Sequence, residues 1–281
     1  MLSVAARFGP HTLVIGLIIG FTLPELAGFL LPYLPQMVAM LLFLAALQIA
    51  PRDIGGSLKD APRTVGYIAA LQLATPVLVL GAGLVSGTTQ SPVFLALFLM
   101  TSAPSIAGSP NMALMLGRTP APALRLLILG TALAPVSVVL LFPFVPALGE
   151  GSEIAVTAAK LAGIILGATF CAALVRVTVL RAPSRAAKTR LRGASNIMLA
   201  VFTVGLMAPL RDLVLSDPSS AIMWFTLACG ANFGLQTLAW IIAKNAPADT
   251  RLAISLISGN RNFALFFISL TPEASALGNR P

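Results

Sequence analysis

The sequence contains nine apolar runs, each about 20 residues long and bounded by Pro, Gly or charged residues. Because a helix needs about 20 apolar residues to cross a bilayer, each run predicts one membrane span. Only 10% of the 281 residues are charged, too few to cover a water-soluble body of this length. The pattern predicts an all-α polytopic membrane protein and excludes a soluble enzyme, a disordered chain and a disulfide scaffold. The predicted spans are 11–30, 34–50, 63–86, 92–117, 121–146, 154–180, 193–214, 219–243 and 250–271.

The 18 Lys and Arg residues are distributed unevenly over the loops between these spans. With a cytoplasmic N-terminus, 14 of them fall on the cytoplasmic side, and only Lys160, Arg211 and Arg280 fall on the other. Because cytoplasmic loops of membrane proteins are enriched in Lys and Arg, this bias predicts that orientation. The same bias explains the net charge of +9. The predicted partner is therefore the lipid bilayer, and no nucleic acid is predicted to bind. Arg261 belongs to neither side, since it lies deep inside the ninth run.

Two of the runs, the fourth and the ninth, are interrupted by small and polar residues near their middle. The fourth contains Pro104, Gly108 and Pro110, and the ninth contains Gly259 followed by three polar residues. Proline removes a backbone donor and glycine permits non-helical dihedral angles, so both runs predict broken helices. Non-helical backbone at membrane depth is tolerated where protein or a water-filled cavity satisfies it. A matched pair of interrupted spans therefore indicates the binding site of a secondary transporter.

The spacing of the two interruptions predicts an internal repeat. Asn111 and Asn262 lie 151 residues apart, and the same offset carries span one into span six and span three close to span eight. Five spans per repeat is an odd number, so the second copy is predicted to be inverted in the membrane. The fold class is thus two inverted five-helix repeats with crossed, discontinuous helices 4 and 9. The counterpart of span five falls after residue 272, where we expect a tenth helix that is absent, as in a truncated chain.

Polar side chains at the predicted crossing provide candidate ligand contacts. Asn111 and Asn262 each carry donors and an acceptor, and they can satisfy freed backbone or touch a ligand. Gln72 places a further amide in span three, where an interhelical hydrogen bond is the alternative role. The other candidates at the crossing are Ser105, Ser109, Gly259, Asn260 and Arg261, and Thr131 adds a hydroxyl from span five.

Five short segments in order resemble the bile acid:sodium symporter family of inner-membrane organic-anion transporters. They are Ala46–Ile54, Gln72–Pro76, Ala107–Met112, Thr131–Pro135 and Gly259–Asn262. The resemblance implies a multi-pass protein of the bacterial inner membrane that carries small organic anions, bile-acid-like or carboxylate, by alternating access. The resemblance therefore implies a transporter. A membrane enzyme is disfavoured separately, because the one histidine, His11, lies at a membrane edge and the sequence has no metal-ligating or nucleophile cluster.

The resemblance also implies how the chain divides. The panel helices are 1, 2, 6 and 7, and the core helices are 3–5 and 8–10, with substrate bound between the two groups beside the crossing. The implied segments are 1–62 (panel helices 1–2), 63–150 (core helices 3–5), 151–215 (panel helices 6–7) and 216–281 (core helices 8–9).

Several positions depart from the family where its sodium ligands are expected. Where the family has an acidic residue before the Gly of the second crossing, this chain has Ile257, and where the family has a hydroxyl residue in the fifth helix, this chain has Leu127. The family's Ser before the first-crossing Asn is replaced by Pro110, and its Gln at the second crossing is replaced by Arg261. Asn111, Thr131, Asn262 and Gln72 remain as oxygen donors, so no other cofactor is predicted and coupling to sodium stays open.

These departures lead to a hypothesis about Arg261, whose fixed charge stands in for a bound sodium ion. It would either hold the crossing together by donating to freed carbonyl groups or pair with an anionic substrate. A purely structural brace is the alternative. Three other functions stay open: a conventional sodium-coupled symporter, an arsenite-type carrier, and a receptor or non-transporting protein. The arsenite carrier is disfavoured because no cysteine lies in the first crossing. The substrate and the oligomeric state are not predicted.

Overall fold

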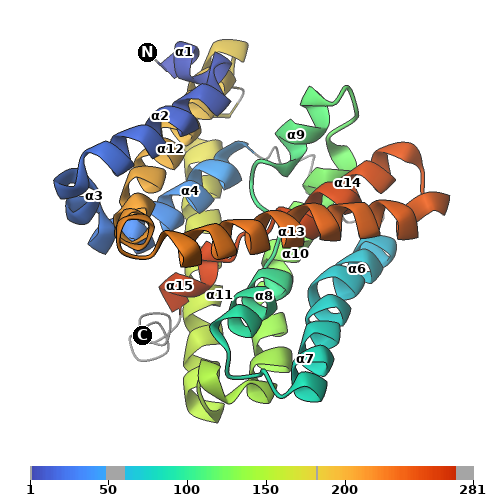
Figure 1. The fold of residues 1–281 in the computed structure, drawn as a ribbon. Helices are drawn as coiled ribbons and strands as arrows, with labels where there is room; N and C mark the ends of the chain where they lie inside the picture. Colours follow the sequence, from blue (N-terminus) through green and yellow to red (C-terminus); the bar gives the residue numbers. More distant parts are fainter. Residues whose placement is uncertain (1, 49–60, 182, 270–281) are drawn as a thin grey trace. The chain divides into compact units, whose positions relative to one another are not determined.

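The computed structural model describes residues 2–48, 61–181 and 183–269, and within them the chain is helical without strands (Figure 1). Six of the helices in these ranges are long and apolar enough to cross a membrane. They run over Pro24–Gln48, Pro62–Ser86, Ala121–Phe144, Gly151–Thr178, Arg185–Ser216 and Pro218–Asn245. The protein is therefore an all-α protein with the pattern of a multi-pass membrane protein. The stretch after residue 272, where the sequence predicts that a tenth helix is missing, lies outside the described residues.

The structure corrects the predicted boundary between the first two spans. The sequence places that boundary at residues 30–34, but the helix continues there through the 3₁₀ turn η1 (Leu31–Tyr33). The chain breaks earlier, at Leu23, between α2 (Gly9–Thr22) and α3 (Pro24–Leu30). Pro24 explains the difference, because proline lacks the donor that would extend α2 and suits the first turn of the next helix.

The chain divides into two compact units, and the first comprises residues 1–50 and 164–227. Its longest helix is α12 (Arg185–Ser216), which packs along α2 (Figure 1). Glycines permit this close approach, since a Cβ atom added at Gly16 would lie 2.7 Å from the backbone oxygen of Ala200. The unit's other elements are α1 (Leu2–Arg7), α3, η1, α4 (Leu34–Gln48), the second part of α11 (Gly151–Thr178) and the start of α13 (Pro218–Ile242).

The close approach of α2 and α12 supports a prediction with an internal control. Gly16→Ala is expected to destabilise the protein by about 1–3 kcal/mol, because the backbone of α12 must shift to admit the methyl group. The melting temperature of the purified protein in detergent should fall by about 5 °C. Gly28→Ala in α3 is the matched control, since nothing lies within 4 Å of its added Cβ atom. Equal melting temperatures for the two variants would contradict this packing.

The second unit comprises residues 51–163 and 228–281. A buried apolar cluster joins α6, α10 and α14 through side chains such as Ile68, Leu126 and Ile254. Phe142 stacks edge-on against Phe266, which ties the end of α10 to α15. The elements are α6 (Ala61–Ala69), the π-helical turn η2 (Ala70–Ala74), α7 (Thr75–Ser86), α8 (Pro92–Ser102), α9 (Ser109–Met115), α10 (Ala121–Leu141), η3 (Phe142–Phe144), η4 (Pro146–Leu148), the start of α11, the end of α13, η5 (Ala243–Asn245), α14 (Ala248–Gly259) and α15 (Ala264–Ser269).

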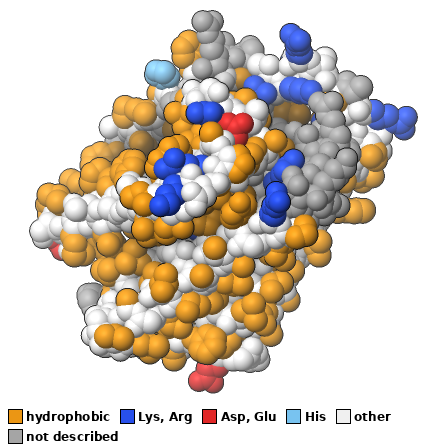
Figure 2. Space-filling view, turned by 90° about the vertical axis from the view of Figure 1, so that its right-hand side faces the viewer, with side chains coloured by type: hydrophobic (Ala, Val, Ile, Leu, Met, Phe, Trp, Pro, Cys, Tyr) orange, Lys and Arg blue, Asp and Glu red, His pale blue; other side chains and the backbone are white. Residues whose placement is uncertain are grey.

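Hydrophobic side chains are exposed over much of the surface of the described residues. Figure 2 shows hydrophobic side chains over much of the face that it displays, with Lys and Arg in separate groups between them. Exposed apolar surface of this extent is typical of helices that face lipid. The panel and core segments predicted from the sequence stay a prediction.

Candidate functional site

Two helix breaks in the second unit pair with each other through their backbones. The first break (residues 103–108) separates α8 from α9, and the second break (residues 260–263) separates α14 from α15. The amide of Ile106 donates to the oxygen of Asn260 at 3.1 Å, and the amide of Asn262 donates to the oxygen of Pro104 at 2.8 Å. Ser105 and Arg261 face each other in this short antiparallel bridge. The two breaks therefore satisfy part of each other's freed backbone.

Arg261 lies at the centre of this bridge and is buried, with 7% of its surface exposed. Its guanidinium group donates three hydrogen bonds, all to backbone oxygens: Nε to Ser258 at 3.0 Å, Nη1 to Ala103 at 2.9 Å and Nη2 to Leu71 at 2.9 Å. One side chain thus joins the end of α14, the end of α8 and the π-helical turn η2. The arrangement agrees with the version of the hypothesis in which Arg261 donates to freed carbonyl groups.

Each of the three acceptors lacks its usual helical donor for an identifiable reason. In the π-helical turn η2 each amide donates to the oxygen five residues earlier, as the amide of Thr75 does to Ala70. The donor for Leu71 would be residue 76, but Pro76 has no amide hydrogen. Ser258 would accept from Asn262 in a continuous helix, but that amide donates across the bridge to Pro104. Ala103 is the extended residue directly after α8.

The helix ends around Arg261 also favour a cation electrostatically. Both α8 and α14 present their C-terminal ends to the guanidinium group, through Ala103 and Ser258. The C-terminal end of a helix carries a partial negative charge of about half an elementary charge. Two such ends stabilise one arginine, and together with three hydrogen bonds they explain how a charged side chain is buried here.

The remaining residues of the predicted crossing divide into two groups. Ser105 and Ser109 are buried, with their hydroxyl oxygens 2.8 Å apart, and the Asn260 side chain donates to the oxygen of Leu256 at 2.8 Å. Asn262 lies in the second break with a half-buried side chain. Asn111, by contrast, lies on α9 with an exposed side chain, which forms no hydrogen bond to the described residues.

The two asparagines that define the repeat are therefore not equivalent in position. Helix α9 begins at Ser109, before Asn111, whereas α15 begins at Ala264, after Asn262. Pro110 accounts for the early start, because its fixed φ angle suits the first turn of a helix.

The residues at the expected sodium-ligand positions also lie in the second unit. The Gln72 side chain is buried in η2 and donates to the Gly130 oxygen and the Ser137 hydroxyl of α10, each at 3.2 Å. Thr131 is buried on the same helix. Three of the positions that depart from the family offer no side-chain oxygen: Ile257 and Leu127 are buried apolar residues, and Pro110 is the second residue of α9.

A polar seam between α13 and α14 was not predicted from the sequence. The Asn232 amide donates to the oxygen of Gly259 at 3.0 Å, and the Gln236 amide donates to the Asn232 side chain. Ser255 and Ser258 donate to backbone oxygens of α13 at 2.8 and 2.9 Å. The sequence feature that indicates this seam is the pair Asn232 and Gln236 within the apolar run 219–243, because side chains four residues apart lie on one face of a helix.

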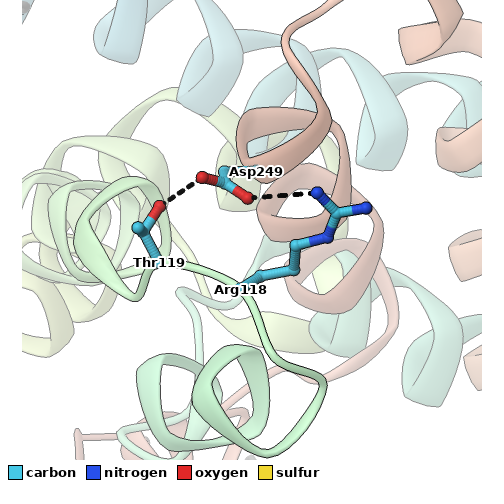
Figure 3. A network of polar contacts seen from close by, with 3 residues as sticks. All are labelled: Arg118, Thr119 and Asp249. Atoms are coloured by element: carbon cyan, nitrogen blue, oxygen red, sulfur yellow. Dashed lines mark hydrogen bonds and ion pairs between the residues drawn. The ribbon is translucent and has the colours of Figure 1, made fainter.

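A second polar network lies at the other end of α14, as Figure 3 shows. Asp249, in the first turn of α14, accepts a hydrogen bond from Thr119 and lies 3.7 Å from Arg118. Both partners belong to the loop between α9 and α10. The network holds that loop to the start of α14, and it lies about 15 Å along the helix axis from the second break.

The structure thus brings Arg261, Ser105, Ser109, Gly259, Asn260 and Asn262 together at the paired breaks. Asn111 lies beside them on α9. No protein-family model matches the chain, and no curated protein matches it. The inference of function therefore depends on the residues themselves, chiefly on Arg261 and the three carbonyl groups that it contacts.

Proposed function

We propose that this protein is a secondary transporter of small organic anions in the bacterial inner membrane, with a cytoplasmic N-terminus and with Arg261 in place of bound sodium. The observation that supports this best is the buried guanidinium group donating to oxygens of Ala103, Ser258 and Leu71. Broken helices that meet in pairs are how transporter folds build a binding site from backbone at membrane depth. In this proposal the paired breaks are the crossing of two inverted five-helix repeats.

The residues present do not fit the sodium coupling that the family resemblance implies. A sodium ion is held by oxygen ligands, and here the guanidinium group already contacts the backbone oxygens at the junction. Ile257 replaces the carboxylate that would favour a cation at this place. A second positive charge 4 Å from Arg261 would be repelled by about 4 kcal/mol at an effective dielectric constant of about 20.

The same charges favour an anionic substrate. The family resemblance implies two sodium ions with one carboxylate, a net charge of +1, and Arg261 next to Ile257 carries the same net charge without any ion. The site is thus permanently in the electrostatic state that a sodium symporter reaches only when its ions are bound. We place the substrate beside the breaks, where the exposed side chain of Asn111 and the half-buried side chain of Asn262 provide donors and acceptors.

A ligand-induced shift in melting temperature tests this proposal. The purified protein is heated with a panel of monovalent organic anions (taurocholate, benzoate and pyruvate), with either sodium or potassium as the counter-ion. An anion present at about 100 times its dissociation constant should stabilise the protein by about 2.7 kcal/mol, and so by about 5–10 °C, in both salts.

The matched controls are the uncharged amide or ester of each acid, which should give no shift. Stabilisation by sodium chloride over potassium chloride, or anion binding only in sodium, would contradict the proposal and favour a conventional symporter that uses Gln72 and Thr131. The absence of a shift with every anion, together with no uptake into proteoliposomes, would favour a non-transporting protein.

A further inference from the structure

Arg261 supplies a positive charge that cannot leave the site. A bound sodium ion dissociates at the end of each transport step, but a guanidinium group is part of the chain and stays protonated at all physiological pH values. We infer that the protein is an anion exchanger, which carries one monovalent organic anion in each direction and returns poorly when empty. This inference rests on the proposed function and adds that the uptake of one anion is coupled to the export of another.

The charge of Arg261 has no acidic counterpart among the described residues. Its three hydrogen bonds end on neutral backbone oxygens. The acid that lies on the same helix, Asp249, is about 15 Å away along α14 and is held by Arg118 and Thr119. The polar seam on the neighbouring helix α13 is formed by the neutral side chains of Asn232 and Gln236. The C-terminal ends of α8 and α14 screen the guanidinium group locally but are the ends of dipoles without net charge, so a substrate anion is the group that brings the net charge of the site to zero.

The loaded and the empty carrier consequently differ in net charge. With a monovalent anion beside Arg261 the site is neutral, and a membrane potential exerts no net force on its movement. Without the anion the site carries one positive charge, and the potential acts on it. An elementary charge that crosses a potential of about 100 mV shifts the equilibrium by about 50-fold. An inside-negative potential therefore holds the empty carrier in its inward-facing state.

This behaviour is opposite in sign to that of a sodium symporter. A symporter that moves two sodium ions with one monovalent anion carries a net positive charge inward when loaded, so an inside-negative potential accelerates uptake. In this protein the positive charge moves outward when the empty carrier returns, so the same potential slows net uptake. Exchange avoids the return of the empty, positively charged carrier, because the carrier returns with a bound anion and its site stays neutral.

Proteoliposomes containing the full chain test the inference, with radiolabelled taurocholate, benzoate and pyruvate as probes and no sodium. Uptake is measured into vesicles loaded with the same unlabelled anion and into vesicles without anion, at zero potential and at about −100 mV. We expect the potential to leave exchange unchanged within about twofold and to slow uptake into anion-free vesicles by about 10- to 50-fold. Efflux into anion-free medium should be accelerated by the same potential.

The outcomes separate this inference from the proposed function. Uptake into anion-free vesicles that equals exchange, or that is accelerated by the inside-negative potential, overturns exchange but leaves anion transport established. Transport of no probe in either format overturns both. Arg261→Gln gives a second readout: where this variant folds, the loaded carrier is negative and the empty carrier neutral, so an inside-negative potential should slow its exchange, which the parent performs independently of potential. A variant whose exchange stays independent of potential would also overturn the inference.

Discussion

Replacement of Arg261 by Met is expected to lower the melting temperature of the purified protein by about 10 °C. Methionine fills much of the same volume but donates no hydrogen bond, so the oxygens of Leu71, Ala103 and Ser258 lose their donor in a buried place. Each unsatisfied buried group costs about 1–3 kcal/mol, so three of them cost at least about 3 kcal/mol. For a chain of this size each kcal/mol corresponds to about 2–4 °C.

The matched control is Arg251→Met, at an arginine within α14. The Arg251 side chain lies over the ring of Trp240 at 4.0 Å from its centre and donates to the Trp240 oxygen at 2.8 Å, in a more exposed place. We expect this variant to lose about 1 kcal/mol and so to melt within about 4 °C of the parent. If both variants melt alike, the guanidinium group of Arg261 does not hold the breaks together.

Replacement of Gly259 by Ala is expected to be strongly destabilising although it adds a single methyl group. A Cβ atom there would meet the backbone oxygen of Asn232 and lie 2.8 Å from Cγ of Gln236. Because α13 contributes backbone to this contact, a rotation of one side chain does not relieve it. Overpacking of this kind costs about 1–3 kcal/mol, and the melting temperature should fall by about 5–10 °C. The shift would also disturb the Gly259 oxygen, which accepts from the Asn232 side chain.

Gly230→Ala, in α13, is the control for this substitution. Nothing lies within 4 Å of an added Cβ atom at Gly230, so alanine should be tolerated or should stabilise the helix by up to about 1 kcal/mol. The double variant Gly259→Ala/Gln236→Ala removes the side-chain part of the clash and should recover only part of the loss. Full recovery would show that the Gln236 side chain alone limits the approach of the two helices.

The sequence by itself determined the class of the protein and the places where its helices break. Long apolar runs with few charges predict membrane helices because a bilayer leaves no water for unpaired backbone, and the structure contains six such helices. Pro104, Pro110 and Gly259 predict the interrupted fourth and ninth runs because proline and glycine act locally. The position of Arg261 within the second break follows from the same pattern. The family resemblance, the inverted repeat and the missing tenth helix stay predictions.

The partners of Arg261 were decided by the tertiary structure alone. Leu71, Ala103 and Ser258 contribute backbone oxygens, which every residue type carries, so no pattern of side chains marks them. The π-helical register that frees Leu71 arises where α6 and α7 join at η2, and the bridge that frees Ser258 needs the first break beside the second. Local chemistry determines where a helix ends, whereas the choice of partner for its freed carbonyls depends on segments distant in the chain.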